Sequence, residues 1–326
     1  MAKVLLLDNV ARQGAEVLER AGHSVEIRTG PLASQELLRA LEGCSAVIVR
    51  SATRITGDLL TDAPALAVIG RAGVGVDNID VEAASRAGVL VVNAPEGNTI
   101  AAAEHTLGLI LALARHIPQA VSTLRRGRWE RQAFVGVELA GKTLGILGLG
   151  RIGSAVAKRA RALEMKVIAY DPYVSSDEAQ RRGVQVASFE EVIKGADFLT
   201  IHLPLTQETQ GLIGTQVLAQ MKPGVRIINA ARGGIIDEEA LAAALQSGQV
   251  AGAALDVLCQ EPCTASPLLG MDNVIITPHL GASTCEAQIH VAVQVAEQVV
   301  LALAGRRPRH ALNWEAVLRY RTPRAI

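Results

Sequence analysis

Short apolar runs alternate with segments of helical spacing along most of this chain. Near the N-terminus, the runs at 3–8, 46–50 and 89–93 are bounded by turn residues, and helical patterns such as 11–21 lie between them. A second series of the same kind starts at Lys142. Almost continuously apolar runs are typical of strands buried on both faces, and their alternation with helices indicates parallel sheets covered on both sides. The pattern therefore predicts an α/β fold.

A long apolar segment separates the two series. Residues 98–114 have the composition of a buried helix, with Asn98 or Thr99 able to cap its start and Pro118 following its end. The next residues, 119–141, are more polar, contain four arginines and lack strong periodicity, so we expect a connecting arm or a subunit contact. A chain of 326 residues that is 49% hydrophobic exceeds one ordinary core and predicts two domains.

Composition and charge exclude several classes of function. The 32 basic and 32 acidic residues balance, so no overall field favours nucleic acid or an anionic membrane as a partner. The N-terminus has no signal pattern, and the apolar segment 99–114 carries Glu104 and His105 and is shorter than a membrane span of ~20 residues. The four cysteines form no dense framework, which predicts reduced thiols in a cytoplasmic protein. Cys259 and Cys263 have no second pair of ligands nearby, so no metal site is expected.

A glycine-rich turn opens the second series. The segment Gly148-Leu-Gly-Arg-Ile-Gly153 follows the apolar run 144–147 and begins a helical pattern, which is the context of a dinucleotide-binding fingerprint. Gly148 would allow the tight turn, Gly150 would let the backbone approach the pyrophosphate, and Gly153 would permit close packing of helix and strand. The N–H groups at the helix start would then hold the phosphates. The alternative is a turn that only connects two elements.

Asp171 supports the dinucleotide interpretation. It ends the next strand-like run, 18 residues after Gly153. A carboxylate there can accept hydrogen bonds from both hydroxyls of the adenosine ribose, and its charge would repel a 2′-phosphate. Pro172 and Tyr173 supply no compensating cation. NAD is therefore favoured over NADP.

Three polar residues follow apolar runs downstream of the fingerprint: Arg232, Glu261 and His279. Ligands of open parallel sheets bind at the carboxyl ends of the strands, so these side chains are expected on one edge. A histidine with an ordinary pKa near ~6.5 can act as a base, a carboxylate can orient it, and an arginine can pair with a substrate carboxylate. This set suits hydride transfer.

Each member of the trio also has a structural interpretation. His279 alone could be structural, Glu261 could be an acid in a surface turn, and Arg232 could cap a loop. Their shared position at strand ends favours catalysis. His202, also at a strand end, is a weaker candidate because no acid lies near it in the sequence to orient it.

Taken together, these residues resemble the D-isomer-specific 2-hydroxyacid dehydrogenases, and most closely the members that act on 3-phospho-D-glycerate. The matching stretches are 49–56, 70–80, 141–153, 229–237, 253–257 and 278–284. The resemblance implies two doubly wound parallel-sheet domains, with a Rossmann NAD domain (99–284) inserted into a flavodoxin-like substrate domain (1–98 and 285–326). It also implies a homodimer assembled through the NAD domain and the 119–141 arm.

The resemblance assigns Arg232, Glu261 and His279 to catalysis. It places the following residues in the NAD site: Val74, Gly148, Gly150, Arg151, Ile152, Gly153, Asp171, Leu203, Ala230, Ala231, Arg232, Asp256, His279 and Gly281. Val74 and Leu203 stand where the family often has threonine, so side-chain hydrogen bonds to the cofactor are expected to be missing there. The expected substrate-binding residues are Arg50, Ser51, Arg54, Arg71, Gly73, Val74 and Gly75. Among these, Arg54 and Arg71 are the candidates for binding a phosphate, with ordinary surface arginines as the alternative.

The implied activity is NAD-dependent oxidation of 3-phospho-D-glycerate to 3-phosphohydroxypyruvate, with a small phosphorylated hydroxy acid as the partner. One alternative keeps the chemistry and changes the substrate to glyoxylate, hydroxypyruvate or D-lactate. A remote alternative is an NAD-sensing corepressor that binds peptides, since fold alone does not determine function. Longer family members carry a C-terminal domain that binds serine, so the expectation for these 326 residues is either an unregulated short form or a truncated chain.

Overall fold

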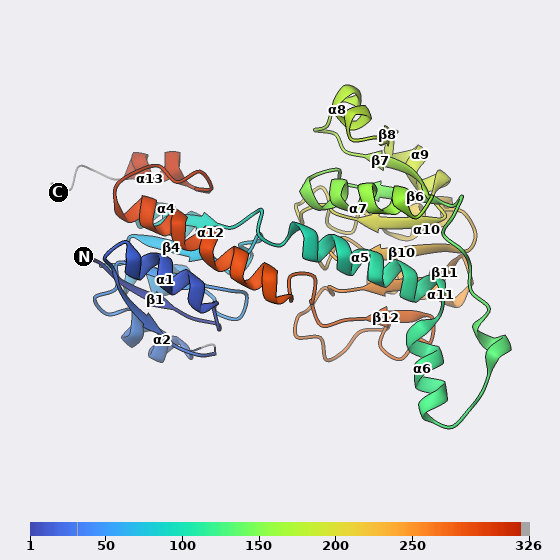
Figure 1. The fold of residues 1–326 in the computed structure, drawn as a ribbon, viewed down its shortest axis with the longest axis horizontal. Helices are drawn as coiled ribbons and strands as arrows, with labels where there is room; N and C mark the ends of the chain where they lie inside the picture. Colours follow the sequence, from blue (N-terminus) through green and yellow to red (C-terminus); the bar gives the residue numbers. More distant parts are fainter. Residues whose placement is uncertain (31, 321–326) are drawn as a thin grey trace. The chain divides into compact units, whose positions relative to one another are not determined.

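Two compact units make up the part of the chain that the computed structural model describes, residues 1–30 and 32–320. The units are Met1–Asn98 with Ala282–Ile326, and Thr99–Gly281 (Figure 1). Each contains one parallel sheet, so the predicted α/β class with two parallel-sheet units is confirmed. The predicted division was 1–98 with 285–326, and 99–284. Its residues 321–326 lie outside the described part, and its assignment of units to substrate and cofactor stays a prediction.

The first unit contains a sheet with the strand order β2-β1-β3-β4-β5, which is the order of flavodoxin-like folds. Its strands are β1 (Lys3–Leu6), β2 (Ser24–Ile27), β3 (Ala46–Val49), β4 (Val68–Arg71) and β5 (Leu90–Asn93). Its helices are α1 (Arg12–Arg20), α2 (Ser34–Leu41), α3 (Gly57–Thr61), α4 (Val81–Arg86), α12 (Cys285–Leu303) and α13 (Trp314–Tyr320). Successive residues of β1 enter different cores: Leu5 packs on one face and Val4 and Leu6 on the other. This is why the strand sequences are apolar throughout.

The second unit contains a seven-stranded sheet with the order β12-β11-β10-β9-β6-β7-β8. Its strands are β6 (Thr143–Leu147), β7 (Lys166–Tyr170), β8 (Gln185–Val186), β9 (Phe198–Ile201), β10 (Val225–Asn229), β11 (Val250–Leu255) and β12 (Val274–Ile276). Its helices are α5 (Thr99–Ala114), α6 (Ile117–Arg125), η1 (Arg131–Phe134), α7 (Arg151–Ala162), α8 (Ser176–Arg181), α9 (Phe189–Gly195), α10 (Thr215–Gln220) and α11 (Glu238–Gln246). Read from β8, the sheet begins with the Rossmann order 3-2-1-4-5-6.

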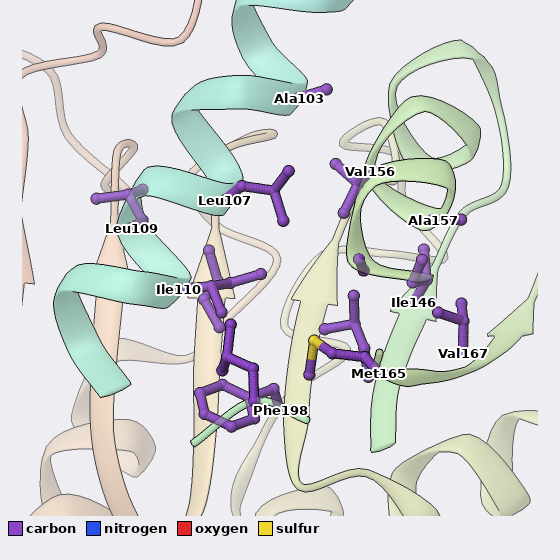
Figure 2. Close-up of a cluster of buried hydrophobic side chains, with 14 of the residues drawn as sticks. Ala103, Leu107, Leu109, Ile110, Ile146, Val156, Ala157, Met165, Val167 and Phe198 are labelled. Atoms are coloured by element: carbon purple, nitrogen blue, oxygen red, sulfur yellow. The ribbon is translucent and has the colours of Figure 1, made fainter. Parts of the chain in front are cut away.

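One face of this sheet is covered by α5 and α7. Figure 2 shows Leu107 and Ile110 of α5 pointing towards Val156 of α7 and Phe198 of β9. Ile110, Val156 and Phe198 are fully buried. The unusually apolar sequence of α5 therefore reflects its position in the core. No single described helix has both the length and the hydrophobicity of a membrane span, and only α5 and α6 together reach them, across a bend of 62°.

Several short elements were not predicted. The arm expected without periodicity begins with the helix α6, and Pro118 lies in its first turn, where the missing N–H costs nothing. Pro118 therefore helps to start a helix as well as following the previous one. α3, α8, β8, η1 and α13 were also missed. Each is seven residues or shorter, so it offers little periodicity.

Candidate active site

The predicted polar residues of the second unit lie along one edge of its sheet. In a parallel sheet all strands end on the same side, and neighbouring strands are about 4.8 Å apart. Following the sheet from β7 to β12, the strand ends carry Asp171, the turn 148–153, His202 with Leu203, the turn 230–232, Asp256 and His279. Residues that are distant in the sequence therefore form a continuous row. The fingerprint lies on one side of the reversal in strand order between β6 and β9, and the trio lies on the other.

The glycine fingerprint has the geometry that a dinucleotide requires. Gly148 has φ +94°, a conformation that side chains rarely adopt. At Gly153 a Cβ would lie 2.0 Å from the carbonyl oxygen of Gly148, so a side chain there is excluded by backbone. At Gly150, the N-cap of α7, a Cβ would meet nothing within 4 Å. The open space lies at the helix N-terminus, where a pyrophosphate would be held.

Asp171 is fixed by two backbone donors. The N–H of Leu149 donates to Asp171 Oδ2 at 2.7 Å, and the N–H of Tyr173 donates to Oδ1 at 2.9 Å. Each carboxylate oxygen keeps acceptor capacity, so both can still receive a ribose hydroxyl. The fingerprint and Asp171 together fit NAD.

Arg182 is a residue of this site that sequence reasoning missed. Its Nη1 donates to Leu149 O at 2.7 Å and to Ser154 Oγ at 2.8 Å, and its Nη2 pairs with Glu178. Arg182 thereby ties the end of α8 to the fingerprint turn. Arg182 belongs to no recognised sequence motif. It follows α8, which has too few residues to be predicted from periodicity.

His279 and Glu261 form a direct pair. His279 Nδ1 lies 2.6 Å from Glu261 Oε2, and the two side chains are 46% and 40% exposed, so a substrate can reach them. The hydrogen bond with Glu261 raises the pKa of His279 above its ordinary value, against the opposing effect of burial. Since Nδ1–H donates to the carboxylate, Nε2 is the nitrogen available to take a proton. The arrangement is that of a base held in one tautomer.

Arg232 lies in a turn that is folded onto the segment before Glu261. The side chain of Asn229 accepts from Ala231 N at 3.0 Å and donates to Arg232 O at 2.8 Å, which closes the turn. A Cβ at Gly233 would lie 1.9 Å from Leu258 O, so this contact requires glycine. Arg232 Nη1 donates to Ala231 O at 2.6 Å, and its positive charge opposes, without outweighing, the effect of Glu261 that raises the pKa of His279.

Asp256 was expected in the cofactor site, but its carboxylate is buried and accepts hydrogen bonds from other residues of the protein. It is 1% exposed, and its carboxylate accepts from Leu280 N and Gly281 N, each at 2.7 Å. Burial raises its pKa, but hydrogen bonds from His105, Thr277 and Leu280 outweigh burial and hold the pKa below its ordinary value. Asp256 is therefore an ionised anchor for the turn that carries His279, and its contact with NAD stays a prediction.

His202 has a different environment. It lies at the end of β9, with Nε2 3.0 Å from Thr200 Oγ1. Burial lowers the pKa of His202 to about 4. It is therefore neutral near pH 7 and poorly suited to exchange protons there, which favours His279 as the acid–base group.

The predicted substrate residues lie at strand ends of the first unit. Asp8 is 6% exposed and accepts from Arg50 N at 2.8 Å and from Thr53 N at 3.0 Å. Asn78 donates to the carbonyl oxygens of both residues, at 2.8 and 2.6 Å. These bonds hold the loop from which Arg50, Ser51 and Arg54 extend. Arg54 and Ser51 are exposed.

At the expected substrate-binding residues 73–75, one of the three backbone N–H groups already has a partner. Gly73 N–H donates to Arg71 O at 2.8 Å, which leaves the N–H groups of Val74 and Gly75 for an anion. The guanidinium of Arg71 folds back, so that its Nη1 donates to Ala72 O at 2.7 Å. Arg71 would have to turn outward to bind a phosphate. Among the described residues, no group of three His, Cys, Asp or Glu could hold a metal ion.

The sequence and the structure of this chain are both similar to those of known proteins. The family model for the NAD-binding domain of D-isomer specific 2-hydroxyacid dehydrogenases matches residues 107–281. The D-3-phosphoglycerate dehydrogenase of Synechocystis sp. is 50% identical over 313 residues, which are 96% of this chain and 56% of that relative. The chain thus spans little more than half the length of this relative.

Two solved structures cover almost the whole chain. A protein of Thermus thermophilus is 36% identical with a TM-score of 0.87, over 95% of this chain and 99% of that one. A glyoxylate reductase of Paecilomyes thermophila is 30% identical with a TM-score of 0.86, over 96% and 99%. The predicted family is confirmed. The chain belongs to the D-isomer specific 2-hydroxyacid dehydrogenase family, and its residues 107–281 match the model of that family's NAD-binding domain.

Proposed function

We propose that the protein oxidises 3-phospho-D-glycerate to 3-phosphohydroxypyruvate with NAD, the entry step of serine synthesis. The reaction type is supported by the pair of His279 and Glu261 at the edge of the sheet that matches the NAD-binding domain. In this pair His279 Nδ1 lies 2.6 Å from Glu261 Oε2. The substrate is supported by relatives named D-3-phosphoglycerate dehydrogenase, which are 48–50% identical over at least 96% of this chain.

The three residues Arg232, Glu261 and His279 have different roles in the proposed reaction. His279 Nε2 takes the proton of the substrate hydroxyl, and Glu261 holds Nδ1–H and stabilises the resulting imidazolium. Arg232 pairs with the substrate carboxylate through its planar guanidinium. NAD, when bound, supplies the acceptor for the hydride that leaves C2. In the reverse direction the protonated His279 returns its proton to the carbonyl oxygen.

A substrate panel tests this proposal. The native protein is assayed with NAD and with NADP on 3-phospho-D-glycerate, D-glycerate and D-lactate, and in reverse on glyoxylate and hydroxypyruvate, by nicotinamide absorbance. We expect the highest kcat/KM for 3-phospho-D-glycerate with NAD, because Asp171 repels a 2′-phosphate and Arg54 favours a phosphorylated acid. Preference for an unphosphorylated acid would contradict the substrate, and preference for NADP would contradict the role of Asp171.

Matched arginine variants extend the panel. Arg54→Ala and Arg71→Ala are expected to lower kcat/KM for the phosphorylated acid by about tenfold or more, since a charge-assisted hydrogen bond contributes about 1.5–3 kcal/mol. The unphosphorylated acids should change little. Arg86→Ala, at an exposed position of α4, is the control. Equal losses on both kinds of acid would show that the arginines do not bind the phosphate.

A second candidate keeps the chemistry and replaces the substrate. The structural similarity to a glyoxylate reductase favours glyoxylate or hydroxypyruvate reduction, because that protein covers nearly the same length as this chain. The same panel distinguishes this function from the first. Either result leaves the trio with the same roles.

We also propose a cytoplasmic homodimer assembled through the NAD-binding unit. In the stretch 117–135, Trp129 and Val135 are 77% and 79% exposed, and Leu124 is 54% exposed. Apolar side chains gathered on one segment mark an interaction surface. A hollow of about 620 Å³ lies between this segment and residues 270–274, where a partner can pack. Sedimentation velocity should give a dimer, and Trp129→Glu with Val135→Glu should give a monomer.

A further inference from the structure

The turn that carries His279 is built around one buried carboxylate. Asp256 Oδ1 accepts from Leu280 N at 2.7 Å and from Thr277 Oγ1 at 2.6 Å, and Oδ2 accepts from Gly281 N at 2.7 Å. The backbone carbonyl of Asp256 accepts from His279 N at 2.9 Å. His279 itself has φ +55°, which is uncommon for a residue with a side chain. The direction of the His279 ring therefore depends on these bonds.

His105 contacts this carboxylate from another element. It lies on α5, and its Nε2 is 3.1 Å from Asp256 Oδ1 and 3.2 Å from Thr277 Oγ1. The side chain of His105 is 21% exposed and that of Asp256 is 1% exposed, so the carboxylate end of the contact is buried. The other donors to Asp256 named above all belong to residues 277–281. His105 thus joins the turn to a long helix of the core.

The hydrogen-bond pattern determines which nitrogen of His105 carries the proton. Thr277 has one hydroxyl proton, and it is donated to Asp256. Asp256 has none to donate, because its hydrogen bonds keep it ionised. His105 Nε2 must therefore be the donor, with Asp256 Oδ1 and Thr277 Oγ1 as acceptors. This is the opposite tautomer to that of His279, which donates from Nδ1.

We propose that His105 is a positioning residue whose Nε2–H anchors Asp256 and Thr277 to α5 and so fixes the turn that presents His279. The proposal rests on the proposed role of His279 as the acid–base group. The charged groups that act on His279 are Glu261, Asp256 and Arg232. His105 contacts Asp256 and Thr277, and Asp256 in turn accepts from the backbone of residues 280 and 281, so His105 acts on His279 through this turn. A small displacement of a catalytic ring is costly, since about 1 Å can change a rate by about 10²-fold.

The test compares two substitutions of the same residue. His105→Leu keeps most of the volume and removes the donor, whereas His105→Gln keeps an N–H at similar reach. His290→Leu, at an exposed position of α12, is the control. We expect His105→Leu to lower kcat about tenfold with less than a twofold change in KM for NAD. His105→Gln should recover most of the activity, and His290→Leu should match the native protein.

A second readout does not depend on turnover. In cofactor-free protein with 15N-labelled histidine, the Nδ1–H signal of His279, assigned with His279→Gln, should shift or broaden in His105→Leu and return in His105→Gln. An unchanged signal, or a Gln variant as impaired as the Leu variant, would overturn the positioning role. If the signal moves but His279→Gln retains full activity, the positioning role stands and the proposed function of His279 fails.

Discussion

Replacing His279 with glutamine is expected to lower kcat for oxidation by about 10²- to 10⁴-fold, the range that a general acid–base group contributes. Glutamine keeps a polar side chain of similar reach but cannot take the hydroxyl proton. NAD binding should change far less than kcat, because the fingerprint at 148–153 and Asp171, which are expected to hold the pyrophosphate and the adenosine ribose, are unchanged. The measurement is steady-state kinetics in both directions, with NAD affinity by calorimetry. A variant that keeps more than a tenth of the native kcat would exclude His279 as the base.

The pH profile gives an independent check on the same group. Oxidation needs neutral His279, and the pKa of His279 is raised by Glu261, so the acid limb should lie above the ordinary value of about 6.5. Reduction needs the protonated form, which the raised pKa retains to higher pH. In Glu261→Gln the acid limb should move to lower pH, while kcat falls because the imidazolium loses its counter-charge. Glu239→Gln, at the exposed start of α11, is the control. An acid limb that stays in place would exclude Glu261 as the partner.

Gly153→Ala is expected to destabilise the cofactor-free protein and abolish NAD binding. Its Cβ would lie 2.0 Å from Gly148 O and 3.1 Å from Gly148 C, so the turn and α7 must separate. Overpacking of this kind costs about 1–3 kcal/mol or more. The measurement is Tm without cofactor, together with the Kd for NAD.

Gly150→Ala is the matched comparison. Gly150 has φ −66°, and its Cβ would meet nothing within 4 Å, so alanine fits the cofactor-free protein. Its Tm should equal that of the native protein, whereas its Kd for NAD should rise at least tenfold, or about 1.4 kcal/mol, because the methyl group occupies the approach of the pyrophosphate. A native Tm for Gly153→Ala would contradict the packing described for this turn. A native affinity of Gly150→Ala for NAD would contradict the expected position of the pyrophosphate.

Except for the two-residue β8, the strands were predictable, because a strand depends mainly on residues that are neighbours in the sequence. Lys166–Tyr170 and Val225–Asn229 are short runs rich in apolar and β-branched residues, and a parallel strand buried on both faces needs little more. The helices α6 and α8 were missed for the opposite reason. In α6 only Thr123 is buried, and in α8 only Ala179, so neither has an apolar stripe that a sequence pattern can reveal.

The positions of the fingerprint turn and of Asp171 at the ends of neighbouring strands were also predictable. A fingerprint between a strand and a helix, followed by an acid at the next strand end, depends on neighbours in the sequence. Arg182 was not, because its contact with Leu149 joins residues that are 33 positions apart. The same holds for His105 and Asp256, which no motif connects.

By itself, the sequence determined the α/β class, which strands lead to the expected ligand-binding edge, and which kinds of side chain follow those strands. Each of these follows from local periodicity and spacing. Only the tertiary structure decided which of these groups meet. Strand order places β10, β11 and β12 side by side and so brings the segments that carry Arg232, Glu261 and His279 to one edge of the sheet, while a left-handed residue at 279 aims the ring at Glu261. Such contacts depend on how segments that are distant in the sequence pack together, and the spacing of residues along the chain does not reveal that packing.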